Sequence, residues 1–207
     1  MEEISTSSFV EKRDEIFKSI PLKKRSIDCE TVSQVLELCI EIAREGREGK
    51  RVGTLFVIGD DRRVLKESRT LIMDPLKGHP KKDKHITNPN LRETVKELAQ
   101  LDGGFMVSGD GYVLSSNRHF NADIDGVEVH YGLGSRHVAA ASITKRTDAI
   151  AIVVSMSSIV RIFDRGRLII EILPELRLMD RISSHIKMPC VTKHRDENIA
   201  IVSETKE

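Results

Sequence analysis

Two short apolar runs, each followed by a turn sequence or a polar residue, constrain the fold of this chain most strongly. Residues 52–58 read Val-Gly-Thr-Leu-Phe-Val-Ile, and residues 149–155 read Ala-Ile-Ala-Ile-Val-Val-Ser. Runs of this length rich in branched side chains are typical of strands buried within a sheet. No stretch approaches the roughly 18 apolar residues that a membrane span requires. A soluble domain built around a buried sheet is therefore expected.

Helical periodicity predicts the elements that cover this sheet. An apolar stripe predicts a helix over residues 29–46, with Asp28 as its N-cap. Weaker patterns predict helices over residues 5–20 and 91–101. The small apolar residues 139–143 suit a helix packed closely on a sheet.

Hairpin signals dominate the second half of the chain. Gly-Asp-Gly at 109–111 lies between the strand-like segments 105–108 and 112–115 and predicts a hairpin whose turn needs positive φ. A second hairpin is expected over residues 159–172, and a late strand over residues 199–203. Together these elements predict an α/β fold, a mixed β-sheet flanked by helices in an α/β sandwich.

Charge and cysteine content narrow the class of protein. Thirty-three Lys and Arg against 32 Asp and Glu give a formal net charge of +1, so no nucleic-acid partner is expected and any polyanion site must be local. The three cysteines lack zinc or disulfide spacing. The N-terminus has no basic start followed by an apolar run. We expect a cytoplasmic protein without a membrane partner.

The familiar phosphate-binding loops are missing. Residues 46–51 have the wrong spacing for a Walker A loop, and a P-loop NTPase is excluded. Gly132 and Gly134 lack the third glycine of a dinucleotide fingerprint. In the lysine-rich segment 77–84, expected to be an exposed loop, His79 has no further metal ligands at zinc spacing.

Two segments nevertheless carry chemistry. Ser135, Arg136 and His137 follow flexible glycines and suit a triphosphate, an interaction that a helix beginning at Ala139 would reinforce. Taken alone, Arg136 and His137 are more often surface or helix-capping residues than ligands. Asp102, before two glycines, can hold a divalent cation or accept a proton, although Asp-Gly is also a common turn.

The order of these features resembles the diadenylate cyclase domain family, particularly its archaeal branch. The family carries an Asp-Gly-Ala motif, matched here by Asp102-Gly103-Gly104, and a later Gly-Thr-Arg-His-Arg motif, matched by Gly134-Ser135-Arg136-His137. The segments Thr147-Asp148-Ala149 and Val153-Val154-Ser155 also fit. The resemblance covers about 120 residues.

The resemblance implies an enzyme that condenses two ATP molecules into cyclic di-AMP and releases two pyrophosphates. Two subunits would face each other in a homodimer or higher oligomer, each holding one ATP. Asp102 would bind Mg²⁺ or Mn²⁺ and help activate the ribose 3′-hydroxyl. The implied catalytic residues are Asp102, Arg136 and His137, and the implied nucleotide-binding residues are Gly103, Gly104, Arg118, His119, Gly134, Ser135 and Ser155.

The resemblance also suggests a division of the chain. Residues 51–178 would form the cyclase-like domain, residues 1–50 a helical extension packed on it, and residues 179–207 a C-terminal tail.

Three positions depart from the family pattern. Gly104 replaces an alanine, which removes only a methyl group, and Val138 replaces an arginine. Met156-Ser157 stands where acidic residues usually follow Val-Val-Ser, and a thioether is a poor ligand for Mg²⁺. Two alternatives therefore stay open: a weakened cyclase that binds ATP or cyclic di-AMP for regulation, and an oligomeric scaffold that shares only the fold.

Overall fold

The computed structural model describes residues 17, 20–122, 127, 132–174, 189–194 and 199–204. The strands are β1 Thr54–Ile58, β2 Ser68–Thr70, β3 Gly104–Val107, β4 Val113–Phe120, β5 Ile150–Val154, β6 Val160–Asp164, β7 Arg167–Leu173, β8 Pro189–His194 and β9 Ile199–Glu204. The helices are α2 Cys29–Glu45, α3 Asp61–Lys66, α4 Pro89–Leu98 and α5 Ser135–Arg146, with 3₁₀ turns η1 Leu22–Arg25 and η2 Lys81–Lys84.

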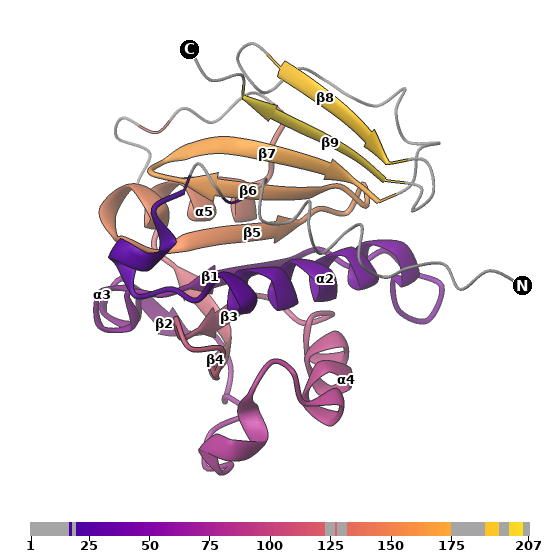
Figure 1. The fold of residues 1–207 in the computed structure, drawn as a ribbon. Helices are drawn as coiled ribbons and strands as arrows, with labels where there is room; N and C mark the ends of the chain where they lie inside the picture. The colour runs from indigo at the N-terminus through magenta and orange to yellow at the C-terminus, as the bar shows by residue number, and fades with distance from the viewer. Residues whose placement is uncertain are drawn as a thin grey trace, which may run out of the picture.

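Within these ranges the strands form one nine-stranded sheet in the order β2-β4-β3-β1-β5-β6-β7-β9-β8. The β1–β3 pair is parallel, and the other neighbouring pairs are antiparallel. Helix α2 crosses one face of the sheet and α5 lies on the other (Figure 1). The predicted mixed sheet flanked by helices is confirmed.

The two faces of the sheet bury different kinds of side chain. On the α2 face, large residues such as Phe56 and Phe105 stack with ring centroids 4.8 Å apart. On the α5 face, Ala140 and Ala141 let the helix lie close to β1 and β5. Because β1 and β5 are buried on both faces, they read as continuous apolar runs.

Most elements lie where the sequence predicts them. Helix α2 follows its N-cap Asp28, both hairpins form, and β9 matches the expected late strand. The first hairpin turn places Gly111 at φ +89°. Two short elements, α3 and the edge strand β2, escaped prediction because neither is long enough to show a period.

Several predicted boundaries were wrong. Helix α4 starts at Pro89, two residues early, because the Asn88 side chain caps it by accepting from the N–H of Asn90. Strand β4 continues to Phe120, well past the expected end at Ser115, because it pairs with β2 as well as β3. Helix α5 starts at Ser135 rather than Ala139.

Some predictions concern parts of the chain that the structure does not cover. The helix expected over residues 5–20 lies outside the described residues except at two positions. Strands β9 and β8 extend the sheet beyond β7, and the division into residues 1–50, 51–178 and 179–207 stays a prediction. None of the helices in the described ranges has both the length and the apolar character needed to cross a bilayer.

Candidate functional site

Two adjoining pockets collect the polar residues that the sequence singled out. The first, the Asp102 pocket, has a volume of about 270 Å³ and is lined by Leu55, Leu71, Asp102, Gly103, Arg118, His119, Phe120, Ala122, Ser135, Arg136 and Ala139. The second, the His137 pocket, has a volume of about 600 Å³ and is lined by Gly132–His137, Val153–Ser157, Ile159 and Arg161. Ser135 and Arg136 belong to both, so the first turn of α5 joins the two pockets.

The turn after α4 presents the Asp102 carboxylate to solvent. The Asp102 side chain is 95% exposed, and its backbone carbonyl accepts a hydrogen bond from Asn117 Nδ2 at 3.2 Å. Gly103 has φ +99°, and a Cβ there would lie 2.7 Å from the backbone carbon of Asn117. Only glycine fits this approach, so the Asp-Gly sequence fixes the turn and at the same time exposes the carboxylate.

The first turn of α5 carries the second motif. Gly134 is the N-cap and Ser135 and Arg136 are the first helical residues. The early start corrects the expectation that the helix begins at Ala139: Ser135, Arg136 and His137 lie within the helix rather than before it. The backbone N–H groups of Ser135 and Arg136 are therefore among those without an acceptor inside the helix, at the positive end of the helix dipole, whereas that of His137 donates to the carbonyl of Gly134 at 3.0 Å.

Asp102 and Arg136 approach each other across the mouth of the Asp102 pocket. Oδ1 of Asp102 lies 3.7 Å from Nη2 of Arg136, whose side chain is 31% exposed. An ion pair this exposed contributes at most about 1 kcal/mol to stability. A ligand with its own charges can therefore displace it at little cost.

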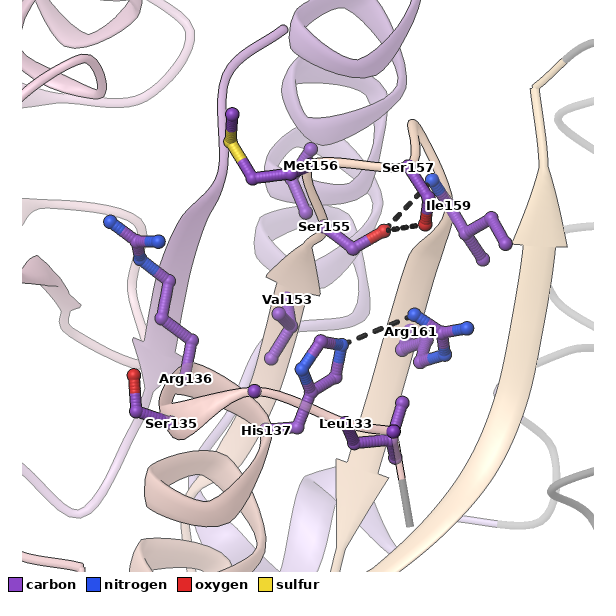
Figure 2. A pocket seen from close by; sticks show the side chains of 13 residues that line it. Leu133, Ser135, Arg136, His137, Val153, Ser155, Met156, Ser157, Ile159 and Arg161 are labelled. Atoms are coloured by element: carbon purple, nitrogen blue, oxygen red, sulfur yellow. Dashed lines mark hydrogen bonds between the residues drawn. The ribbon is translucent and has the colours of Figure 1, made fainter. Parts of the chain in front are cut away.

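The Arg136 guanidinium also reaches the start of β1 and the end of β5. A Cβ on Gly53 would lie 3.3 Å from Nη1 of Arg136 and 3.2 Å from Sδ of Met156. Figure 2 shows Arg136 extending toward the side of the pocket on which Met156 lies, whereas the His137 ring turns toward Arg161. The absence of a side chain at Gly53 leaves room for both.

The His137 ring forms part of the pocket wall and is only 6% exposed. Its Nε2 lies 3.2 Å from Nη1 of Arg161, and Nε of Arg161 lies 2.6 Å from Oε1 of Glu171. Arg136 therefore presents a partly exposed side chain to both pockets. His137, in contrast, is buried and hydrogen-bonded to Arg161 of strand β6.

Arg118 and His119 line the Asp102 pocket from the last part of β4. Arg118 donates to Ser68 Oγ and to the carbonyl of Ser68, both at 2.9 Å. Burial lowers the pKa of Arg118, against the opposing effect of Asp74. These bonds give Arg118 a structural role, while His119 is exposed at the pocket.

Asp74 braces β4 behind this pocket. Its carboxylate accepts hydrogen bonds from both Ser115 and Ser116, including the Ser116 N–H at 3.2 Å. Burial alone would raise the pKa of Asp74, but these hydrogen bonds outweigh it and the pKa is lowered.

The remaining two expected nucleotide-binding residues, Ser155 and Gly104, are less well placed to contact a ligand than those described above. Ser155 lines the His137 pocket, but its hydroxyl lies 2.7 Å from Ser157 Oγ and accepts the N–H of Ile159 at 3.2 Å, which holds the turn between β5 and β6. Gly104 is buried at the start of β3 and lines neither pocket.

Sequence reasoning missed Arg161 and Glu171. Both are charged residues in the apolar middle of their strands, and a register shift between Ile162 and Phe163 places them directly opposite each other across β6 and β7. Counting outward from the turn would have paired Arg161 with Ile170 instead, so the sequence carried no signal for this cross-strand ion pair.

The described residues alone do not provide a complete set of metal ligands. Among the residues that the structure describes, no three His, Cys, Asp or Glu side chains gather around a common point. Asp102 supplies one exposed carboxylate, which fits a Mg²⁺-type ion only if substrate phosphates and water complete the coordination.

Known proteins resemble this chain over most of its length. It is 40% identical over 166 residues to a protein of Methanocaldococcus jannaschii named diadenylate cyclase, a match covering 80% of this chain and 51% of that protein. A protein of Haloferax volcanii with the same name is 38% identical over 145 residues, covering 70% and 53%. The chain thus spans about half the length of the curated relatives it matches.

The fold has a solved counterpart. A Bacillus cereus structure described as a hypothetical membrane spanning protein superposes with a TM-score of 0.51 at 22% identity, covering 67% of this chain and 62% of that one. The family model described as DisA bacterial checkpoint controller nucleotide-binding matches residues 41–168, which include both motifs and both pockets. This chain therefore belongs to the DisA nucleotide-binding, or diadenylate cyclase domain, family.

Proposed function

We propose that this chain condenses two ATP molecules into cyclic di-AMP with release of two pyrophosphates. The observation that carries the proposal is the approach of Asp102 and Arg136 to 3.7 Å where two pockets join. A carboxylate and a guanidinium are thereby placed beside the positive end of α5. The names of the two archaeal relatives support the same activity.

The triphosphate fits the first turn of α5. Free backbone N–H groups and the Ser135 hydroxyl donate to phosphate oxygens. Arg136 adds a positive charge, and its attraction to the phosphates strengthens as the transition state gains negative charge. The Arg161 charge is already offset by Glu171, so Arg136 is the principal cation facing the phosphates among the pocket residues described.

The nucleoside fits the Asp102 pocket. Leu71 and Phe120 supply apolar surface and His119 a flat ring for stacking, while Arg118 shapes the wall. Asp102 at the mouth accepts a hydrogen bond from the ribose 3′-hydroxyl and takes its proton as the oxygen attacks. A bond then forms from the 3′-oxygen to the α-phosphorus of the other ATP, and the bond to pyrophosphate breaks.

A divalent cation, Mg²⁺ or Mn²⁺, would be held by Asp102 together with phosphate oxygens. When bound, it supplies positive charge that stabilises the departing pyrophosphate.

Ring closure requires two nucleotides in opposite orientation. One chain offers a single Asp102–Arg136 arrangement, so we propose that two chains face each other across these pockets. Sedimentation of the protein with and without ATP and Mn²⁺ tests this pairing: a species that stays monomeric under turnover conditions contradicts it.

The activity is tested by incubating the purified chain with ATP and Mg²⁺ or Mn²⁺ and detecting cyclic di-AMP by mass spectrometry. Asp102→Asn is expected to give no product, whereas Asp83→Asn, which removes an exposed carboxylate that lines neither pocket, keeps wild-type synthesis. Absence of product from the wild type with either metal refutes the proposal.

A second candidate function is a nucleotide-binding regulatory module with weakened turnover. The observation that favours it is Met156, which is 60% exposed and lines the His137 pocket where the family usually has an acidic residue. Calorimetry that detects ATP or cyclic di-AMP binding, together with no synthesis in the assay above, would support this alternative. Robust synthesis excludes it.

A further inference from the structure

A buried chain of three polar side chains forms the wall of the His137 pocket. Glu171, Arg161 and His137 are 2%, 5% and 6% exposed. Nε of Arg161 lies 2.6 Å from Oε1 of Glu171. Nη1 of Arg161 lies 3.2 Å from Nε2 of His137, the contact drawn in Figure 2. These three side chains link strands β7 and β6 to the first turn of α5.

This arrangement holds Arg161 in one position. Arg161 and Glu171 are directly paired residues of the β6–β7 hairpin, so the backbone keeps their side chains side by side. A buried guanidinium without its carboxylate would be strongly destabilising, which makes the ion pair a fixed element of the wall. Arg161 therefore presents Nη1 to His137 from a rigid strand.

The direction of the hydrogen bond follows from the chemistry of the two groups. A guanidinium has five N–H donors and no acceptor. The nitrogen that faces it, Nε2 of His137, must accept and therefore carries no proton. The single ring proton lies on Nδ1. Phe163, whose ring centroid is 6.1 Å from that of His137, packs edge-on and limits rotation of the imidazole.

We propose that Arg161, held by Glu171, is a positioning residue that fixes His137 as the Nδ1–H tautomer and locks its ring beneath the first turn of α5. His137 then anchors the turn that carries Ser135 and Arg136 and does not use Nε2 as a base toward substrate. This role in catalysis rests on the proposed function, whereas the tautomer does not.

The tautomer is measured by ¹⁵N NMR of the imidazole nitrogens at neutral pH. The chain has seven histidines, and the His137 signals are assigned by their loss in His137→Gln. The wild type is expected to show a protonated Nδ1 and an unprotonated Nε2. A protonated Nε2 in the wild type overturns the proposal.

The double variant Arg161→Met/Glu171→Leu removes the donor without leaving a buried charge unpaired. Its His137 is expected to shift toward the Nε2–H tautomer. The matched control is Arg25→Met/Asp164→Leu, which removes another internal ion pair, 2.5 Å long, between η1 and the end of β6. The control should keep the wild-type His137 signals. Unchanged His137 signals in the Arg161 variant would contradict the assignment.

The consequence for the site is measured as ATP affinity by calorimetry and as kcat and KM for cyclic di-AMP synthesis. Losing a group that orients a site residue typically costs about 10–100-fold. That loss is expected in the Arg161 double variant and not in the control. A shifted tautomer with unchanged affinity and rates refutes the positioning role. A wild type with the Nδ1–H tautomer but neither binding nor synthesis instead refutes the proposed function and leaves the tautomer assignment intact.

Discussion

Replacing Gly104 by alanine, the residue that the family motif usually carries, is expected to destabilise this protein. A Cβ on Gly104 would lie 2.4 Å from the carbonyl oxygen of Leu55, whereas Cβ atoms essentially never come closer than 3.0 Å to another atom. Strand β3 must therefore move by about 0.6 Å from β1, the difference between these distances. The added Cβ would also lie 3.1 Å from Cε2 of the Phe120 ring, so β3 has little room to move.

The magnitude follows from two opposing effects. Overpacking a close-packed interior costs about 1–3 kcal/mol. Alanine restricts the unfolded chain more than glycine does, which returns about 0.5–1 kcal/mol. The difference between these ranges is about 0–2.5 kcal/mol, and because the closest contact is with backbone we expect its upper part, a net loss of about 1–2.5 kcal/mol or a melting temperature about 2–10 °C lower. Gly104 differs from the family's alanine by only one methyl group, but in this chain the packing of β3 against β1 leaves no space for that methyl group.

Urea unfolding followed by circular dichroism measures this difference directly. The matched control is Gly134→Ala, where φ is −76° and no atom lies within 4 Å of the added Cβ, so its free energy of unfolding should change by less than about 1 kcal/mol. A Gly104→Ala variant as stable as the wild type would show that β1 and β3 are not packed as closely as the structure indicates.

Four further predictions address the site and the core. Asp102→Asn should change the free energy of unfolding by less than about 0.5 kcal/mol, because the side chain is 95% exposed, while synthesis measured by mass spectrometry is lost. Because hydrogen bonds lower the pKa of Asp74, its carboxylate stabilises the fold fully above the ordinary aspartate value of about 3.9 and loses that effect as the pH falls through the lower folded value. Urea unfolding of Asp74→Asn and the wild type should therefore differ most above about pH 5 and converge in stronger acid. Asn117 has φ +51°, so Asn117→Ala should be about 1–2 kcal/mol less stable than Asn117→Gly, which loses the same amide but tolerates the conformation; equal thermal stability would contradict this. Phe56→Ala should cost about 3–5 kcal/mol in chemical denaturation because the ring is fully buried, whereas Met73→Ala, 92% exposed, should stay within about 0.5 kcal/mol.

The reliable parts of the sequence prediction were those with strong local causes. Helix α2, the buried strands β1 and β5 and both hairpins follow from periodicity, apolar runs and turn chemistry, which act over a few residues. The predicted start of α5 was wrong because Ser135, Arg136 and His137 show no helical spacing of apolar residues. A helix can begin with such residues when its later turns are packed on a sheet.

For the candidate site, too, some features follow from local sequence and others from the tertiary structure. The sequence alone singled out the candidate site residues, because the Asp-Gly-Gly and Gly-Ser-Arg-His motifs are local and ordered along the chain. Only the tertiary structure decided that Asp102 meets Arg136, that Arg118 is tied to Ser68, and that His137 turns away to Arg161. These partners lie far apart along the chain, and their side chains meet only because the order of strands in the sheet fixes where each turn and each helix start lies.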